Sequence, residues 1–560
     1  MVKKLLPVTL LGAALNILAF GFLYGQANHD FELAMLNWIR DPTLYPGDAI
    51  LGGFIRYPSI FWRALALVPR GVNTEALLFG LFLLTKFLFF LGVAWTARFA
   101  TSDPRFVKLT ILLVALAPAL NRRLPFGAVR LLDPIQTQSP LAIAVLAVGC
   151  AALLEGRWIL ATVLTAMSIY LSVPYTVYAV FAFFAFALID LGSKARTVLF
   201  SGLLGSTLML PWVAMNVRML RQHDPPSYVH ALLLFFPWHL KWSTHHRVDF
   251  VYGPIFLLTA FSVTLWAHKK KSAPNFRLET MAAAFAAPLA IGLIAGEVHL
   301  TPLLARMQLM RADAFLFLFS AIVLFVSVYN LARARAIPFR RVAIPTAFLL
   351  FVMPFTPLHL SLLILGLVVA FWRDCNEFVR RYIGGLSSTR HRPIARSILA
   401  MAAALFAGLL AETAHSTPFR EMFSIAGRVP NNWAAVQLWA RDNTPLYAVF
   451  LVPTFMEGFR VLSERSSWGE WKDGTAVYLD PPFADTYISR MNDVGWSTAP
   501  DINGHGTVEQ RYRALSWATL LALSRKHHLQ YIVQYRDVSY PEAPPPVYAN
   551  PGFAVYKVQP

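Results

Sequence analysis

Long apolar runs are the feature that most constrains this chain. A helix needs about 20 apolar residues to cross a hydrocarbon core about 30 Å thick. Runs approaching this length recur from the N-terminus to about residue 412, and they predict about thirteen membrane-spanning helices. The predicted spans lie near residues 5–25, 75–98, 107–121, 140–155, 158–173, 175–192, 197–216, 251–267, 280–297, 314–331, 342–355, 358–372 and 396–412. The predicted fold is therefore mainly α, a polytopic transmembrane helical bundle over residues 1–412.

The composition agrees with a membrane protein. Of the 560 residues, 57% are hydrophobic, whereas soluble domains contain about 45–50% apolar residues. The net charge of +19 would suit a nucleic-acid partner, but the lysines and arginines mostly flank the apolar runs. Membrane topology explains these charges, so no nucleic-acid partner is predicted. Cys150 lies in an apolar run and Cys375 in a basic loop, which does not suggest a disulfide framework.

Basic residues in short loops assign the sides of the membrane, because cytoplasmic loops are enriched in lysine and arginine. Lys3 and Lys4 place the N-terminus in the cytoplasm, and an odd number of spans then leaves the C-terminal segment outside. Three predicted outer loops are nevertheless basic: 122–139, 217–250 and 298–313. An anionic ligand at the outer face would explain this charge. The alternative is that long loops tolerate charge on either side.

The first outer loop, residues 26–74, gathers scarce acidic residues at the end of the first span. Its segment NHDFELAMLNWIRDPTLYPGD contains Asp30, Glu32, Asp41 and Asp48, although the whole chain has only 30 acidic residues. Asp41 precedes a proline, which favours a turn. Residues 57–71 mix aromatic and aliphatic residues with arginines and are too short to cross a membrane, so they predict an interfacial amphipathic helix.

Residues 413–560 have the composition of a soluble domain, which the topology places outside the membrane. The segments NNWAAVQLWARDNTP (431–445) and SWATLLALSRKHH (516–528) predict helices. Short apolar strands are predicted at residues 447–453, 529–536 and 553–558. Because helices and strands alternate, we predict a small extracytoplasmic α/β domain with some parallel strand pairing.

This plan resembles the GT-C superfamily of membrane glycosyltransferases, which includes oligosaccharyltransferases, protein mannosyltransferases and aminoarabinose transferases. Residues 28–48, with the pattern DPxLYPxD, and residues 433–474 look most like poorly characterised bacterial members. The resemblance implies a GT-C-type bundle in a bacterial cytoplasmic (inner) membrane. It implies transfer of a sugar, with inversion, from a polyprenyl-phosphate-linked donor to a glycan, lipid or protein acceptor at the outer face. It also implies a first-loop carboxylate that acts as general base or as ligand of a divalent metal, Mg²⁺ or Mn²⁺.

Asp30 is the first choice for the catalytic base, because it lies just past the first span, where the resemblance places the carboxylate. The alternative is that Asp30 caps the helix predicted at 31–39. Glu32 is a second candidate base or a favourable acid in the first helical turn. Asp48 is the third catalytic candidate, because it matches the acidic motif position despite lying in a turn. His29 would orient Asp30 or bind the acceptor.

A leaving phosphate needs cationic partners, and arginine offers two parallel N–H donors. Arg311 is the preferred candidate, because it lies at the outer end of a predicted span; an ion pair with Asp313 is the alternative. Arg122 and Arg123 open another basic outer loop, which also contains Arg130, and they are further candidates for substrate binding.

The stretch EGFRVLSERSSWGEWKDG, residues 457–474, is dense in aromatic and charged residues. Aromatic faces with polar fringes suit sugars, so we predict that Arg460, Arg465, Trp468 and Lys472 face the membrane site and bind acceptor or carrier phosphate. A salt-bridged surface loop is the alternative. The histidines of HLKWSTHHR, residues 239–247, lack metal-site spacing, so no residue is assigned as a metal ligand.

Two other functions fit the same plan. A non-catalytic GT-C-like scaffold or assembly protein would keep the bundle without needing Asp30. A transporter of lipid-linked glycans should show repeat symmetry between its halves and broken helices near mid-membrane. Neither pattern is clear in the sequence, and a glycosyltransferase is the preferred prediction.

Overall fold

The computed structural model describes residues 2–25, 28–48, 50–51, 59–121, 123–220, 223–245, 247–334, 431–496 and 505–558. The predicted spans at 342–355, 358–372 and 396–412 lie outside these residues. Arg122 and the predicted domain boundary near residue 412 also lie outside them.

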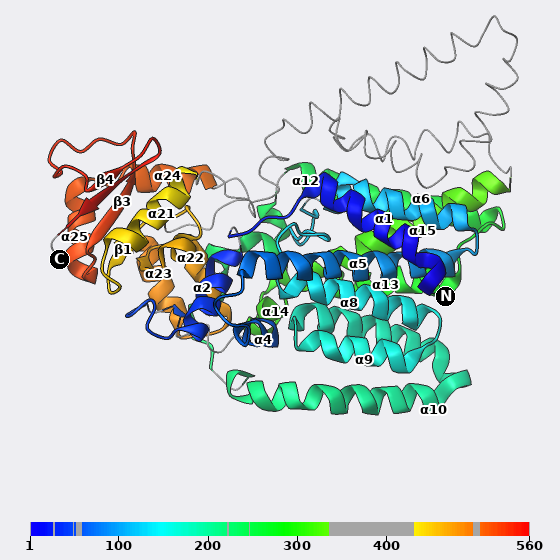
Figure 1. Cartoon of the computed structure of the whole chain (residues 1–560). Coiled ribbons are helices and arrows are strands. Elements are labelled where there is room, and N and C mark those ends of the chain that lie inside the picture. Colours follow the sequence, from blue (N-terminus) through cyan, green and yellow to red (C-terminus); the bar gives the residue numbers. More distant parts are fainter. Residues whose placement is uncertain are drawn as a thin grey trace, which may run out of the picture.

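Most of the described chain forms a bundle of long apolar helices that run side by side (Figure 1). The main helices are α1 (Val2–Phe20), α5 (Thr74–Ala100), α6 (Pro104–Leu116), α8 (Gln138–Leu154), α9 (Trp158–Ile169), α10 (Val173–Leu220), α12 (Arg247–Lys269), α13 (Phe276–Val298) and α15 (Asp313–Arg333). Within the described chain, five stretches are long and apolar enough to cross a membrane: α5, α10, α12, α13 and the run from Pro302 to Arg333. The mainly helical, membrane-type fold is confirmed, whereas a count of thirteen spans is not.

α10 covers 48 residues but reverses direction at Lys194, whose φ of −132° and ψ of 30° are not helical. Asp190, before this break, accepts a hydrogen bond from the Trp158 indole at the start of α9 (2.9 Å). The carbonyl of Leu208, after the break, accepts one from the Tyr170 hydroxyl at the end of α9 (2.7 Å). The two halves therefore run antiparallel, as two separate predicted spans require.

Small residues let the bundle helices approach closely, as is common in membranes. A Cβ atom at Gly92 of α5 would lie 2.6 Å from the carbonyl carbon of Ala147 in α8, so this contact requires glycine. Outward faces are apolar: Leu199, Leu203 and Leu210 of α10 are 67%, 69% and 62% exposed. Exposing such surface to water costs about 25 cal/mol per Å², so this face fits contact with lipid.

The segment between α7 (Pro118–Asn121) and α8 folds back against the bundle. Lys86, buried in α5, donates from Nζ to the backbone carbonyl of Asp133 (3.2 Å). This contact gives a partner to an ammonium group that would be costly in an apolar span. The backbone N–H of Leu23 donates to the Pro134 carbonyl (2.9 Å). The segment is therefore held beside the end of α1.

The C-terminal domain contains, among its described residues, a five-stranded sheet of order β2-β1-β3-β5-β4. Its strands are β1 (Val449–Leu451), β2 (Ser466–Trp468), β3 (Tyr531–Tyr535), β4 (Tyr548–Ala549) and β5 (Phe553–Lys557). β1 pairs in parallel with β2 and β3, whereas β5 pairs antiparallel with β3 and β4. The helices are α21 (Asn432–Asn443), α22 (Phe459–Ser463), η5 (Trp471–Tyr478), α23 (Phe483–Asp493), α24 (His505–Arg513) and α25 (Trp517–His527). The predicted small α/β fold is confirmed.

Short helices connect the bundle to the C-terminal domain: α2 (His29–Arg40), α4 (Ile60–Ala66), α11 (Tyr228–Phe235) and α14 (Pro302–Met307). α2 contacts α22 and η5, and α11 contacts η5 and α23. The C-terminal domain lies at one end of the bundle and the N-terminus at the other (Figure 1). The first loop and the C-terminal domain therefore share one end of the molecule, as the predicted topology requires.

α4 is a shorter form of the amphipathic helix predicted in the first loop. Ser59 caps it by accepting a hydrogen bond from the backbone N–H of Phe61 (3.2 Å). Phe61, Trp62 and Leu65 are buried, whereas Arg63 is exposed. One face of α4 therefore packs on the protein, and its position at a membrane interface stays a prediction.

Candidate active site

Asp30 lies in the first turn of α2, where the bundle meets the C-terminal domain. The N-cap position of α2 is Asn28, so the alternative that Asp30 caps the helix is wrong. Asp30 is 1% exposed, and neither of its carboxylate oxygens has a hydrogen-bond donor among the described residues. Ionising a buried carboxyl group without donors is costly, which makes Asp30 a functional candidate.

Charged residues of the C-terminal domain affect the pKa of Asp30. Burial raises the pKa of Asp30 to about 7, and the charge of Glu457 adds to this rise. Arg460 and Lys472 oppose the rise in pKa, whereas Asp473 adds to it. All four residues belong to the 457–474 stretch. A pKa near 7 suits a general base that operates at neutral pH.

His29 uses both ring nitrogens within the chain. Nδ1 accepts a hydrogen bond from the backbone N–H of Gly25 (3.2 Å), so Nε2 carries the proton and donates to the Gln136 carbonyl (2.8 Å). Burial lowers the pKa of His29 to about 4, which keeps the ring neutral. These bonds leave no ring nitrogen for an acceptor molecule. They fit the other predicted role, positioning the start of α2 and hence Asp30.

Glu32 belongs to a chain of hydrogen bonds. Gln138 Nε2 donates to Glu32 Oε1 (2.8 Å), and Trp62 Nε1 donates to Gln138 Oε1 (2.8 Å). The chain ties together α2, α8 and α4, which are distant in sequence. This geometry favours a positioning role for Glu32 over the role of an alternative base.

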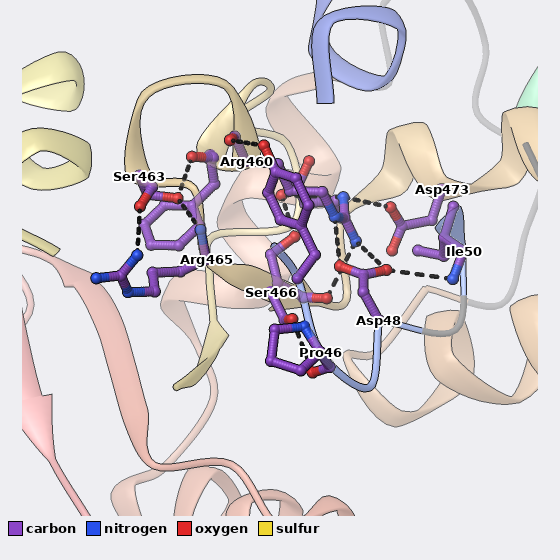
Figure 2. Close-up of polar contacts among 12 residues, drawn as sticks. Pro46, Asp48, Ile50, Arg460, Ser463, Arg465, Ser466 and Asp473 are labelled. Atoms are coloured by element: carbon purple, nitrogen blue, oxygen red, sulfur yellow. Dashed lines mark hydrogen bonds and ion pairs between the residues drawn. The ribbon is translucent and has the colours of Figure 1, made fainter. Parts of the chain in front are cut away.

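Arg460 is the centre of a buried acidic cluster that joins the first loop to the C-terminal domain (Figure 2). Its Nε lies 2.7 Å from Asp48 Oδ2, and its Nη1 lies 3.0 Å from Asp473 Oδ1 and 3.4 Å from Glu470 Oε1. The pair with Asp48 connects positions 412 residues apart. Both partners are engaged by the chain itself, which favours structural roles over the predicted catalytic role of Asp48 and substrate-binding role of Arg460.

The turns of the first loop are stabilised locally. Asp41 Oδ1 accepts hydrogen bonds from the backbone N–H and the hydroxyl of Thr43 (3.0 and 2.6 Å), and Asp41 Oδ2 pairs with Arg70 (2.8 Å). The turn predicted at Asp41 is therefore confirmed. The hydroxyl of Tyr45 donates to the Arg460 carbonyl (3.0 Å), so the same segment also contacts the C-terminal domain.

Arg465 and Trp468 pack inside the C-terminal domain. Arg465 Nη2 donates to the carbonyls of Arg441 (2.6 Å) and Thr444 (2.8 Å). The ring of Trp468, in β2, lies 4.4 Å from the ring of His527. The structure therefore does not bring these two predicted substrate-binding residues to the acid.

Lys472 lies within electrostatic range of Asp30. Its ammonium nitrogen is 4.0 Å from Glu457 Oε1 and stands over the rings of Phe236 (5.1 Å) and Trp471 (5.5 Å). Aromatic faces attract a cation without cancelling its charge. Lys472 can therefore contribute positive charge beside the acid.

Arg311 forms a separate cationic position. Its Nη1 donates to Gln308 Oε1 (2.6 Å), and its Nη2 donates to the Tyr175 hydroxyl (3.1 Å). The Asp313 carboxylate accepts from the backbone N–H of Gly127 (2.7 Å), and the alternative ion pair with Arg311 is not formed. Among the described residues, no carboxylate lies within ion-pair distance of Arg311, and neutral groups hold its guanidinium.

Arg123 and Arg130 face each other across an antiparallel bridge at exposed positions. His239 Nδ1 donates to the Gly127 carbonyl in the turn between them (2.6 Å). Burial lowers the pKa of His239, and the charges of Arg311 and Arg123 add to this lowering, so both arginines lie within electrostatic range of the ring. Glu457, which acts on Asp30, also acts on Arg123. Arg123 therefore lies within electrostatic range of an acidic residue that also acts on Asp30.

Glu457, Glu470 and Tyr175 join this site without a sequence signal of their own. For Glu457 and Glu470, the only indication in the sequence is the high density of charged residues in 457–474. Nothing local separates Glu470 from Glu464, yet Glu470 is buried near Asp30 and Glu464 ends α22 in a left-handed conformation. Tertiary packing alone makes the distinction.

A divalent metal does not fit the described residues. In that part of the chain, no group of three or more His, Cys, Asp or Glu side chains is arranged to hold a metal ion. The carboxylates of Asp48, Glu470 and Asp473 instead surround the guanidinium of Arg460. The positive charge at the centre of this cluster is thus part of the chain.

Comparison with known proteins gives one sequence match inside the C-terminal domain and a structural likeness at a low TM-score. A family model described as a domain of unknown function (DUF6798) matches residues 431–494. No curated protein matches the chain. The chain is similar to two crystal structures of the Archaeoglobus fulgidus oligosaccharyltransferase, one in complex with Zn and sulfate and one in the apo form. Both align at 11% identity and a TM-score of 0.42, covering 94% and 95% of this chain and 68% and 69% of that one. The function is therefore inferred from the geometry of the site.

Proposed function

We propose that this protein is a membrane glycosyltransferase in which Asp30 is the general base. The observation that carries this proposal is the Asp30 carboxyl group, buried without a donor at the junction of the bundle and the C-terminal domain. Because its pKa is near 7, a large share of the carboxyl group is ionised at neutral pH and still basic enough to take a proton.

The proposed reaction moves a sugar from a polyprenyl-phosphate-linked donor to a hydroxyl group of a glycan, lipid or protein acceptor. The acceptor oxygen bonds to the anomeric carbon while the bond from that carbon to the phosphate oxygen breaks. The phosphate leaves with the bonding electron pair, and the acceptor proton passes to Asp30. Attack opposite the leaving group inverts the anomeric carbon.

Cationic side chains near the acid would stabilise the leaving phosphate. Arg311 is held by the neutral Gln308 and Tyr175, so no carboxylate of the described chain offsets its charge. A guanidinium in this setting can form charge-assisted hydrogen bonds to phosphate oxygens. Arg123 and Lys472 add positive charge around the same site, which opposes the negative charge that develops on the leaving group.

The proposed location is the outer face of a bacterial cytoplasmic membrane. The loop after α12 contains Lys269, Lys270 and Lys271, and α12 runs away from the junction with the C-terminal domain. The N-terminus, which Lys3 follows closely in the sequence, lies at the end of the bundle away from the C-terminal domain (Figure 1). The positive-inside rule assigns this end to the cytoplasm, which leaves the site and the C-terminal domain outside.

Mass spectrometry of lipid-linked sugars and outer-face glycans tests this function in cells with and without the gene. Deletion should remove one glycan modification and cause one lipid-linked sugar to accumulate. In cells complemented with Asp30→Asn, sugar transfer should be roughly 10²–10⁴-fold lower than in cells complemented with the wild type, which is the range for a lost general base. Asp41→Asn changes a turn carboxylate in the same loop and should restore transfer.

A non-catalytic scaffold is the second candidate. It is favoured by the engagement of Asp48, Arg460 and Arg465 in internal contacts. A scaffold predicts that Asp30→Asn complements as well as the wild type. Glycans and lipid-linked sugars that do not change on deletion would contradict the transferase.

A further inference from the structure

Arg123 and Arg130 stand side by side on the turn between α7 and α8. The two residues pair in an antiparallel bridge, and inside it the backbone N–H of Leu124 donates to the Val129 carbonyl (2.8 Å). This bond makes Arg123 and Arg130 a non-hydrogen-bonded pair, in which opposite residues are closest, with Cα atoms about 4.5 Å apart. Both side chains therefore leave the same face of the turn.

Within the described chain, neither arginine has an ion-pair partner. Both side chains are exposed, and no described carboxylate lies within ion-pair distance of either guanidinium. Glu457 and Asp133 act on Arg123 only from beyond that distance. Like charges directly opposite each other destabilise a strand pair, and positive charge in an outer loop opposes the insertion bias. An anion bound between the two arginines would offset both costs.

The turn between the arginines is fixed to the bundle. The Asp313 carboxylate accepts hydrogen bonds from the backbone N–H groups of Phe126 (3.2 Å) and Gly127 (2.7 Å). A Cβ atom at Gly127 would lie 2.6 Å from the Met310 carbonyl oxygen, so this close approach requires glycine. A site whose backbone is ordered before binding loses less conformational entropy when a ligand binds.

The same contacts set the depth of the turn. Asp313 is the first residue of α15, and a Cβ atom at Gly253 of α12 would lie 2.9 Å from the Phe126 ring. Gly253 follows Arg247, the first residue of α12, by six residues, which is about 9 Å along a helix. The proposed orientation puts these ends of α12 and α15 at the outer face. The arginine pair therefore lies near the level of phospholipid headgroups, whose anionic group is phosphate.

We propose that Arg123 and Arg130 together bind one phosphate group at the outer membrane boundary. Guanidinium groups that share one face can donate parallel N–H bonds to phosphate oxygens. The phosphate belongs either to a bilayer phospholipid or to a soluble anion from the outer aqueous phase. This is a second anion position, besides the one proposed at Arg311. It rests on the proposed membrane orientation and is independent of sugar transfer by Asp30.

Native mass spectrometry of the full-length protein in detergent, titrated with phosphatidylglycerol, tests the phospholipid source. The wild type should retain this lipid, and Arg123→Gln and Arg130→Gln should each bind it roughly tenfold more weakly, as expected for lost charge-assisted hydrogen bonds. Arg70→Gln is the matched control, because Arg70 is half-exposed but pairs with Asp41 (2.8 Å); it should bind like the wild type. Equal weakening in all three variants would reveal only general attraction by surface charge and would overturn the site.

Inorganic phosphate, added without phospholipid, tests the soluble source. If the bound anion is soluble, phosphate should raise the Tm of the wild type, and neither Arg123→Gln nor Arg130→Gln should show this rise. A response that depends on both arginines, with either ligand, supports the site and identifies its source. The absence of such a response with both ligands overturns the site.

Thermal unfolding without added anion separates binding from folding. Because like charges oppose each other across the bridge, Arg130→Gln should unfold at the same Tm as the wild type or at a higher one. A lower Tm would mean that Arg130 stabilises the turn through contacts within the chain, which contradicts an anion site.

Discussion

At the scale of single residues, Asp30 lowers the stability of the fold that contains it. Its pKa of about 7 lies above the ordinary value of 3.8, so the folded protein holds this proton more tightly than the unfolded chain. Stability therefore falls as pH rises from about 4 to about 7 and stays low above that range. A difference of about three pKa units corresponds to roughly 4 kcal/mol. A buried carboxyl group with this cost is expected to serve function rather than folding.

Asp30→Asn should stabilise the protein at high pH, because an amide has no charge to bury. Thermal unfolding in detergent should show a higher Tm than the wild type at about pH 8, and the two values should converge near pH 4. Asp41→Asn is the matched control: hydrogen bonds from Thr43 lower the pKa of Asp41, so this change should not raise the Tm at high pH. A lower Tm for Asp30→Asn at about pH 8 would show that Asp30 stabilises the fold.

At the scale of elements, the ion pair between Asp48 and Arg460 couples the first loop to α22. Both side chains are almost fully buried, and removing one partner from a buried pair typically costs about 3–5 kcal/mol. Arg460→Gln should therefore loosen residues 41–48 while the bundle helices stay folded. Hydrogen exchange measured by mass spectrometry should rise in this segment and in α22.

Arg441→Gln is the control for this experiment, because Arg441 is half-exposed and pairs with the exposed Asp442. Its exchange in residues 41–48 should match that of the wild type. A double variant with Asp48→Asn should loosen the segment less than the sum of the two single changes, because both remove the same pair. If hydrogen exchange in residues 41–48 of Arg460→Gln equals that of the wild type, the ion pair between Asp48 and Arg460 does not hold the first loop in place.

At the scale of the whole molecule, the first loop and the C-terminal domain must face the same side of the membrane. In a variant lacking Cys150 and Cys375, a membrane-impermeant maleimide added to intact spheroplasts should label Leu67→Cys and Glu542→Cys. Leu67 is 85% exposed. Lys270→Cys, in the loop after α12, should react only after permeabilisation. Labelling of Lys270→Cys alone would place the site in the cytoplasm and contradict the proposed location.

Much of the architecture could be predicted from local sequence. Apolar length predicts the bundle helices because a bilayer sets one length for every span. The helix at Trp517–His527 and the strands at Tyr531–Tyr535 and Phe553–Lys557 follow from caps and short apolar runs. Asp30 stood out because a scarce carboxylate followed a span directly. In each case the deciding residues are neighbours in the chain.

The composition of the site was decided by tertiary structure. Asp48 and Arg460 lie in the two segments that carry the family resemblance, yet they form an ion pair with each other across 412 residues. Glu470 lies near Asp30, although no motif distinguishes it. Asp313 is two residues from Arg311 but binds the backbone of Gly127 instead. The sequence by itself determined a helical membrane protein with a small α/β domain and an acidic first loop. Which charges pair and which stay available depends on contacts between distant segments, because burial and electrostatic interaction are set by distance in space.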